Sequence, residues 1–429
     1  MNCRENLASL KTLDVIWCCG HPPDITESVF SYDYCRKTSR QLCESKLNVL
    51  SWHDLDFGFA CSADEKARFF LHYKELGADC LMIVSNPEIV ISPAAVKKMM
   101  QTLENGVAVI LPVFNETSNS SQSANMPWIY FNLSTYLEVS EFMADINKSV
   151  MLNGIETCGT EITPENIDCS CVLIQKEFVE NFISFIEHGI SLQDALTSFI
   201  SYLVSRKLCV IETSALLHSF SGSYYGGKRI DLADLVPDLA ENILDVGCAS
   251  GGFGELMKTR RSDIHITGVE MNSILAENAS RHYDQIHNNK IEDIHFKTTF
   301  DHINCGDIIE HLDDPWQMLK LFYILLKKGG SLVISIPNAG HWTIVKDLAA
   351  GRFEYIPGGL LCLTHIRWFT EKSIKEALQE AGFDIELFHQ GQIPPTPCGE
   401  RFIELLCDNN MGDRTSLLTN AFTIRAWKR

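Results

Sequence analysis

The stretch ILDVGCASGGFGELMK, residues 243–258, combines an apolar run, a group of glycines and a segment with helical spacing. The apolar residues at 243–246 are typical of the end of a buried strand, and those at 253–257 have the spacing of one helix face. Glycines at such a strand-to-helix corner let a ligand approach the backbone closely. The corner therefore predicts a binding site for a small molecule.

Two acidic residues flank this corner. Asp245 lies two residues before Gly247, and Glu270 ends the next apolar run, about 20 residues after Gly251. An acid at this distance along the chain reaches the hydroxyl groups of a ribose in mononucleotide-binding folds. We therefore expect a ligand that contains a nucleoside, and the alternative is an ordinary tight corner with solvated acids.

The charges near the corner distinguish between two such ligands. A pyrophosphate is best bound by amide donors away from carboxylates, whereas a sulfonium with an ammonium group is favoured by acids such as Asp245 and Asp307. Ala249 also stands where a G-x-G-x-x-G motif would place its second glycine. The residues therefore favour S-adenosylmethionine over a nicotinamide dinucleotide.

The whole chain is long enough for two domains. It has 429 residues, of which 45% are hydrophobic, and a chain of this length is too long for a single hydrophobic core. A serine-, glycine- and proline-containing segment at 219–241 predicts the boundary at about residue 225. The predicted domains are therefore 1–225 and 226–429.

Composition also limits the partners. A formal net charge of -19 argues against nucleic acid as a partner. The start of the chain lacks a basic segment followed by a long apolar one, and no run reaches the length of a membrane span, so we expect a cytoplasmic protein. The 16 cysteines show no repeated metal-ligand spacing, so reduced thiols are expected and a zinc site is not. The oligomeric state is not indicated.

Strand-like and helix-like segments alternate in the second half. The strand-like runs are 243–246, 265–269, 301–305, 331–336 and 384–388, and the helix-like stretches are 252–260, 272–282, 315–327 and 371–381. This pattern predicts a doubly wound α/β sheet, with the final run NAFTIRAWKR as an antiparallel strand at the sheet edge. The first half alternates too, with helical stretches at 64–76 and 93–104, so a second α/β domain is expected.

From about residue 240 onward, the chain resembles the class I S-adenosylmethionine-dependent methyltransferases. The motifs that carry the resemblance are ILDVGCASGGFGELM, ITGVEMN, CGDIIEHLDDPW, LLKKGGSLVISIPNAGHW and THIRWFTEKSIKEALQEAGF. The resemblance implies a Rossmann-like sheet and the cofactor S-adenosyl-L-methionine. It implies that the cofactor is bound by Asp245, Gly247, Cys248, Ala249, Gly251, Glu270, Met271 and Asp307.

Three histidines are candidates for the catalytic base. Methyl transfer to oxygen needs an aligned acceptor and a base that works near neutral pH, for which histidine is suited. His311 lies in DIIEHL, His341 in PNAGHW and His365 in THIRWFT. His311 is our first choice, and the alternative is that each histidine caps a helix or holds a loop.

Residues of about 10–223 resemble the nucleotide-sugar glycosyltransferases of the GT-A type. The resemblance rests on FGFACSADEKARFFLHYKELGADCLMIVSNPEIVISPAAVKKMM, in which Asn-Pro-Glu occupies the place of the metal-binding motif. It implies a divalent cation and a nucleotide-sugar, with Glu88 and His218 as candidate metal ligands and Asp194 as a candidate base.

Together these features predict a methyltransferase that uses S-adenosylmethionine and acts on a small-molecule or glycan-type acceptor. Its fusion to a glycosyltransferase-like domain favours O-methylation in polysaccharide or glycoconjugate biosynthesis. Two alternatives are open: a bifunctional glycosyltransferase-methyltransferase, and a non-catalytic scaffold that binds a sugar or nucleotide.

Overall fold

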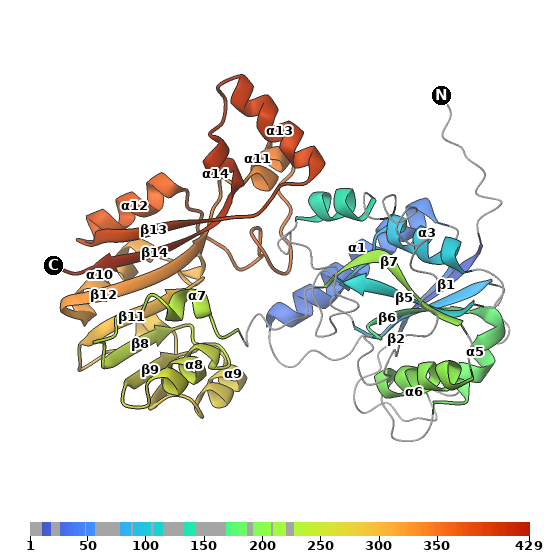
Figure 1. Cartoon of the computed structure of the whole chain (residues 1–429), viewed down its shortest axis with the longest axis horizontal. Helices are drawn as coiled ribbons and strands as arrows, with labels where there is room; N and C mark the ends of the chain where they lie inside the picture. The colour runs from blue at the N-terminus through green and yellow to red at the C-terminus, as the bar shows by residue number, and fades with distance from the viewer. Residues whose placement is uncertain are drawn as a thin grey trace. The chain divides into compact units, whose positions relative to one another are not determined.

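The computed structural model describes residues 11–18, 26–47, 49–55, 78–86, 89–103, 107–114, 132–141, 144, 169–186, 192–206, 209–219 and 227–429. The chain divides into two compact units (Figure 1). The first comprises Met1–Ile129 and Leu133–Gly222, and the second comprises Tyr130–Asn132 and Ser223–Arg429. Strands and helices build both units, so the expected α/β class is confirmed.

The first unit contains a mixed sheet of seven strands in the order β2-β1-β3-β6-β5-β7-β4. β1 pairs in parallel with β2 and β3, whereas β6 runs antiparallel to both of its neighbours. The strands are β1 (Leu13–Cys18), β2 (Val49–Leu55), β3 (Cys80–Val84), β4 (Ile89–Val90), β5 (Val107–Phe114), β6 (Cys171–Gln175) and β7 (Cys209–Ser219).

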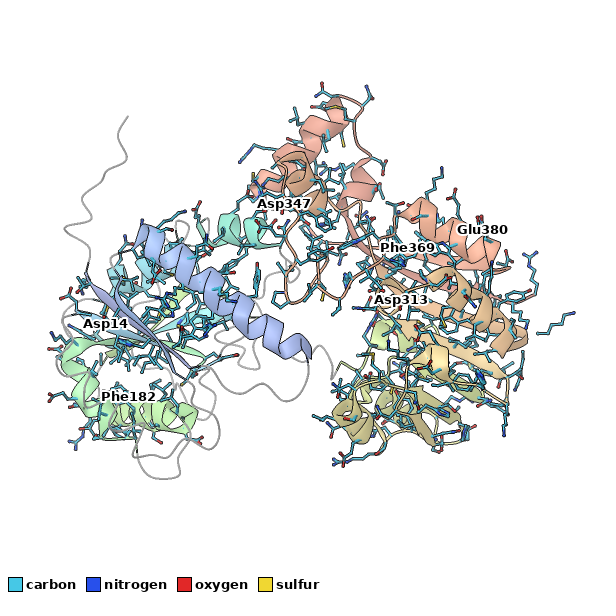
Figure 2. The ribbon with its side chains drawn as sticks, turned by 180° about the vertical axis from the view of Figure 1, so that it is seen from behind. Asp14, Phe182, Asp313, Asp347, Phe369 and Glu380 are labelled. Carbon is cyan, nitrogen blue, oxygen red and sulfur yellow. The ribbon has the colours of Figure 1, made fainter. Side chains whose placement is uncertain are left out.

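Helices cover both faces of this sheet: α1 (Thr26–Lys46) and α3 (Pro93–Thr102) lie on one face, and α5 (Lys176–Ile183) and α6 (Leu192–Ser205) on the other (Figure 1). Phe182 of α5 and Phe199 of α6 are fully buried, with ring centroids 5.4 Å apart, and Figure 2 labels Phe182 in this layer. The predicted helix at 64–76 lies outside the described residues.

The second unit contains a seven-stranded sheet in the order β10-β9-β8-β11-β12-β14-β13. Its first five strands are parallel, and the order reverses between β8 and β11, which is where doubly wound sheets bind ligands. The strands are β8 (Asn242–Val246), β9 (His265–Val269), β10 (Gln285–His287), β11 (Phe300–Gly306), β12 (Leu326–Pro337), β13 (Asp384–Gln392) and β14 (Thr419–Trp427).

Alternate residues of β8 face two different hydrophobic cores. Ile243 packs in one cluster with Phe253, whereas Leu244 packs in another with Phe322 and Ile374. The helices of this unit are α7 (Ile230–Ala233), α8 (Gly252–Arg260), α9 (Ser273–Ala279), α10 (Pro315–Leu325), α11 (Trp342–Ala349), α12 (Glu371–Glu380), α13 (Pro397–Asp408) and α14 (Arg414–Leu418). Helices on both faces of a mainly parallel sheet give the Rossmann-like architecture expected from the sequence.

The predicted place of the last strand is wrong. β14 is antiparallel as expected, but it lies between β12 and β13, and β13 forms the edge. The burial explains the arrangement, because Phe422, Ile424 and Ala426 of β14 are almost fully buried, whereas β13 is half-buried or exposed along its length. In the part of the chain that the structure describes, no helix is long and apolar enough to cross a membrane.

Candidate functional site

The turn between β8 and α8 has a backbone conformation that favours glycine. Gly247 and Gly251 have φ values of 73° and 94°, and Ala249 has 46°, so three positions lie in the left-handed region. The Gly247 and Cys248 amides donate to the Val269 carbonyl at 2.8 and 3.0 Å. These bonds tie the turn to the end of β9, and they bring four of the predicted cofactor residues together at the reversal of strand order.

Glu270 lies directly against this turn. One carboxylate oxygen accepts from the Ala249 amide at 3.1 Å, and the other accepts from the Asn272 amide at 2.8 Å. The side chain of the neighbouring Met271 is exposed. The two bonds therefore fix a half-buried carboxylate at the carboxyl end of β9, where a ligand in the turn would meet it.

Asp245 is buried and held by two side chains from distant segments. Tyr283 Oη donates to Asp245 Oδ2 at 2.5 Å, and Asn304 Nδ2 donates to Oδ1 at 2.6 Å. Burial raises the pKa of Asp245 to about 6, although both hydrogen bonds lower it. Tyr283 and Asn304 were not predicted, but the small residue Gly254 is a signal: a Cβ there would lie 2.3 Å from the Tyr283 ring.

Asp307 follows β11 and forms an ion pair that was not predicted. Arg229 Nη1 donates to Asp307 Oδ2 at 2.8 Å, and Ser335 Oγ donates to Oδ1 at 2.8 Å. Arg229 Nη2 also donates to Ser335 Oγ at 2.9 Å. The sequence places Arg229 in an interdomain segment, so only the fold shows that a cation lies beside Asp307, one of the acids predicted to bind the cofactor.

Two of the three predicted histidines come together. The rings of His311 and His365 are perpendicular, with centroids 4.7 Å apart. Burial, and then the neighbouring His311, lower the pKa of His365 to about 4. The chain segments run side by side because the Ile366 and Arg367 amides donate to the Glu310 carbonyl at 2.9 and 3.0 Å. Figure 2 labels Asp313 and Phe369 where these segments continue.

His341 has different surroundings. It precedes α11, its Nδ1 lies 2.9 Å from Thr343 Oγ1, and its ring packs beside Trp342. Burial lowers the pKa of His341 to about 3. These contacts favour the alternative that His341 holds the start of the helix, and its catalytic role stays a prediction.

Comparison with known proteins identifies part of the second unit. Residues 223–387 match a family model described as a methyltransferase domain. The second unit contains a class I methyltransferase domain. The match includes the glycine turn, both flanking acids and the two adjacent histidines.

Several curated methyltransferases are similar to this domain. A ubiquinone biosynthesis O-methyltransferase of Coxiella burnetii is 34% identical over 128 residues, which are 28% of this chain and 54% of that protein. A phosphoethanolamine N-methyltransferase of Triticum aestivum is 32% identical over 113 residues, which are 25% of this chain and 22% of that protein. The chain thus spans about half the length, or less, of these two relatives.

Solved methyltransferase structures give a weaker likeness. An S-adenosylmethionine-dependent methyltransferase from Archaeoglobus fulgidus is 19% identical, with a TM-score of 0.34, and the match covers 48% of this chain and 97% of that one. The N-methyltransferase NodS from Bradyrhizobium japonicum, solved with S-adenosyl-L-homocysteine, is 16% identical with a TM-score of 0.28; the match covers 44% of this chain and 78% of that one.

The candidate residues of the first unit stay predictions. Glu88 lies outside the described residues, and of His218 only the backbone is described, opposite Val90 in β4. Asp194 is exposed in the first turn of α6. The family match begins at residue 223, so the GT-A identity, the divalent cation and the nucleotide-sugar all rest on the sequence resemblance.

Proposed function

We propose that the methyltransferase domain transfers a methyl group from S-adenosylmethionine to a hydroxyl group of a small-molecule or glycan-type acceptor. The observation that carries the proposal is the meeting of the glycine turn, Glu270, Asp307 and the His311–His365 pair at the carboxyl ends of β8, β9 and β11. Doubly wound sheets bind ligands at this end.

The charges at the site fit the cofactor. S-adenosylmethionine supplies a methyl group on a sulfonium, and its methionyl part carries an ammonium and a carboxylate. Glu270 is fixed by the Ala249 amide in a position that suits the two ribose hydroxyls. Asp307 and Arg229 offer one negative and one positive partner for the methionyl charges. Their mutual ion pair at 2.8 Å would then reorganise when the cofactor binds.

The acceptor side of the site favours oxygen. His311 is the last residue of the 3₁₀ helix Ile309–His311, which begins two residues after Asp307 and shortly after the end of β11. A histidine there suits removal of a proton from a hydroxyl near neutral pH. The relatives' names include both O- and N-methyltransferases, so they do not decide the acceptor atom, and we propose oxygen because of the histidine. We propose a glycan-type acceptor because the first half resembles glycosyltransferases.

Calorimetry with S-adenosylmethionine, followed by mass spectrometry of products from candidate sugars and phenols, tests the proposal. We expect cofactor binding and an acceptor mass increase of one methyl group. His311→Ala should lower the transfer rate by about 10²-fold and leave cofactor affinity unchanged. A folded protein that binds no S-adenosylmethionine would support the non-catalytic scaffold instead.

A further inference from the structure

Glu310 is a buried carboxyl group, only 1% exposed. Among the residues that the structure describes, no donor meets the geometry of a hydrogen bond to its Oε1 or Oε2. Burial, and then the charge of Asp307, raise the pKa of Glu310 well above its ordinary value. Buried carboxylates in proteins are normally paired with donors or cations. The side chain therefore occupies a position that a cation would stabilise.

Two imidazoles beside Glu310 have their tautomers fixed. His311 Nδ1 lies 3.1 Å from the Thr364 carbonyl, and His365 Nδ1 lies 3.0 Å from the Leu360 carbonyl. Because a carbonyl oxygen can only accept, each Nδ1 carries a proton, and in the neutral ring each Nε2 then carries the lone pair. Histidines that bind metals commonly donate the other ring N–H to a carbonyl or carboxylate in this way.

The three side chains are close enough to share one ion. One ligand atom from each of Glu310, His311 and His365 lies within 4.8 Å of the other two. Glu310 Oε1 lies 3.9 Å from His365 Nε2. Metal–ligand bonds of about 2.0 to 2.2 Å in a tetrahedral site place two ligand atoms about 3.3 to 3.6 Å apart. Side-chain rotations that move the ligand atoms by about 1 Å would therefore complete the coordination.

We propose that Glu310, His311 and His365 bind a divalent first-row transition-metal ion such as Zn²⁺ or Co²⁺. Two imidazole nitrogens and one carboxylate are ligands that such ions prefer. Three protein ligands also leave a position open for a substrate oxygen.

The role of the ion rests on the proposed function. An acceptor hydroxyl at the open position would have its pKa lowered by the ion and would release its proton to water. His311 would then act as a metal ligand, and the ion would replace it in activating the hydroxyl. The site lies beside Asp307, which places this activation next to the cofactor residues.

Metal binding can be measured without cofactor or acceptor. The full chain, stripped with a chelator, should bind one equivalent of Co²⁺ and develop the visible absorption of a protein-bound ion. Zn²⁺ should displace it. Glu310→Gln and His365→Ala should each weaken Zn²⁺ binding by about 100-fold or more. His389→Ala is the matched control, because His389 is exposed on β13, and it should leave affinity unchanged.

The wild-type titration decides the outcome even where a variant fails to fold. The proposed site would be overturned if the folded wild type bound no stoichiometric Co²⁺ or Zn²⁺. It would also be overturned if Glu310→Gln and His365→Ala both bound Zn²⁺ with the affinity of the wild type. S-adenosylmethionine binding measured on the same stripped protein separates the two proposals. If the protein binds the cofactor but no metal, only the metal-site proposal is wrong. If it binds metal but no cofactor, the proposed methyl transfer is wrong.

Discussion

At the scale of single residues, the two acids beside the glycine turn have different environments. Asp245 is 2% exposed and has both oxygens bonded to the side chains of Tyr283 and Asn304. Glu270 is half-buried and is bonded to main-chain amides. Asp245 is therefore tied into the interior of the unit, and Glu270 is the more accessible of the two acids.

Glu270→Ala should weaken S-adenosylmethionine binding by about 2 to 3 kcal/mol, as expected for loss of charge-assisted hydrogen bonds to the ribose. Isothermal titration calorimetry measures the change. Glu277→Ala is the control, because Glu277 is exposed on the neighbouring helix α9. Equal affinity in a folded Glu270 variant would remove this residue from the cofactor site.

His302 predicts a pH dependence of stability. Burial, and then the charge of Arg425, lower the pKa of His302 from 6.5 to about 3. Between these values the unfolded chain binds a proton that the folded protein does not. The stabilisation is therefore present above pH 6.5 and is lost, by about 1.4 kcal/mol per pH unit, as the pH falls towards 3.

His302→Asn should remove this contribution. Asparagine can still bond to Ser331, whose Oγ lies 2.7 Å from His302 Nδ1. We would measure urea unfolding of both proteins from pH 7 to pH 4. The variant's free energy of unfolding should fall less steeply with decreasing pH, because the variant takes up about one proton fewer on unfolding. Parallel curves would show that His302 does not titrate in this way.

The sequence predicts the acids of the site better than their partners. Glu270 follows an apolar run at a spacing that ribose binding requires, so one local pattern is sufficient. Arg229 reaches Asp307 only because the segment before α7 lies across the end of β11. Tyr283 and Asn304 meet at Asp245 from two other segments. Pairings between distant segments depend on the folded sheet, which local periodicity does not report.

At the scale of elements, the sequence predicts which segments are strands and helices more closely than where they lie. The helix predicted at 252–260 is α8 with the same bounds, because the glycine turn and the apolar spacing mark it. β12 begins at Leu326, five residues earlier than expected, through a Lys-Lys-Gly-Gly stretch without a strand pattern. The alternation in β14 reports which faces are buried and carries no information on neighbouring strands.

Two glycines with the same φ value allow the effect of backbone strain to be measured apart from the effect of steric crowding. Gly247 and Gly329 both have φ of 73°. A Cβ at Gly247 would lie 2.1 Å from Ile308 Cδ1, whereas one at Gly329 meets nothing within 4 Å. Gly329→Ala should cost about 1 kcal/mol in unfolding free energy from backbone strain.

Gly247→Ala should cost more than Gly329→Ala and should also weaken cofactor binding, because Ile308 and the turn must shift. Thermal unfolding and calorimetry measure the two effects. If both variants lose equal stability and keep full affinity for S-adenosylmethionine, the crowding at Gly247 has no role in the site.

At the scale of the whole molecule, the second unit holds all the strands of its own sheet within Asn242–Trp427. We therefore expect a fragment of residues 226–429 to fold and to bind S-adenosylmethionine with the affinity of the full chain. Circular dichroism and calorimetry measure both properties. An insoluble fragment that recovers binding only when the first half is added would show that the predicted domains 1–225 and 226–429 are not independent.

The insertion of β14 between β12 and β13 has a consequence for how the chain is made. During synthesis β13 leaves the ribosome before β14, so β13 cannot pair with the sheet until β14 is made, because β14 is the strand that joins it to β12. Pairing β12 with β14 closes a loop of about 80 residues, and such distant pairings form slowly. In the newly made chain, β13 therefore lacks its neighbouring strand until β14 has been synthesised, and an unpaired strand edge of this kind is prone to aggregation.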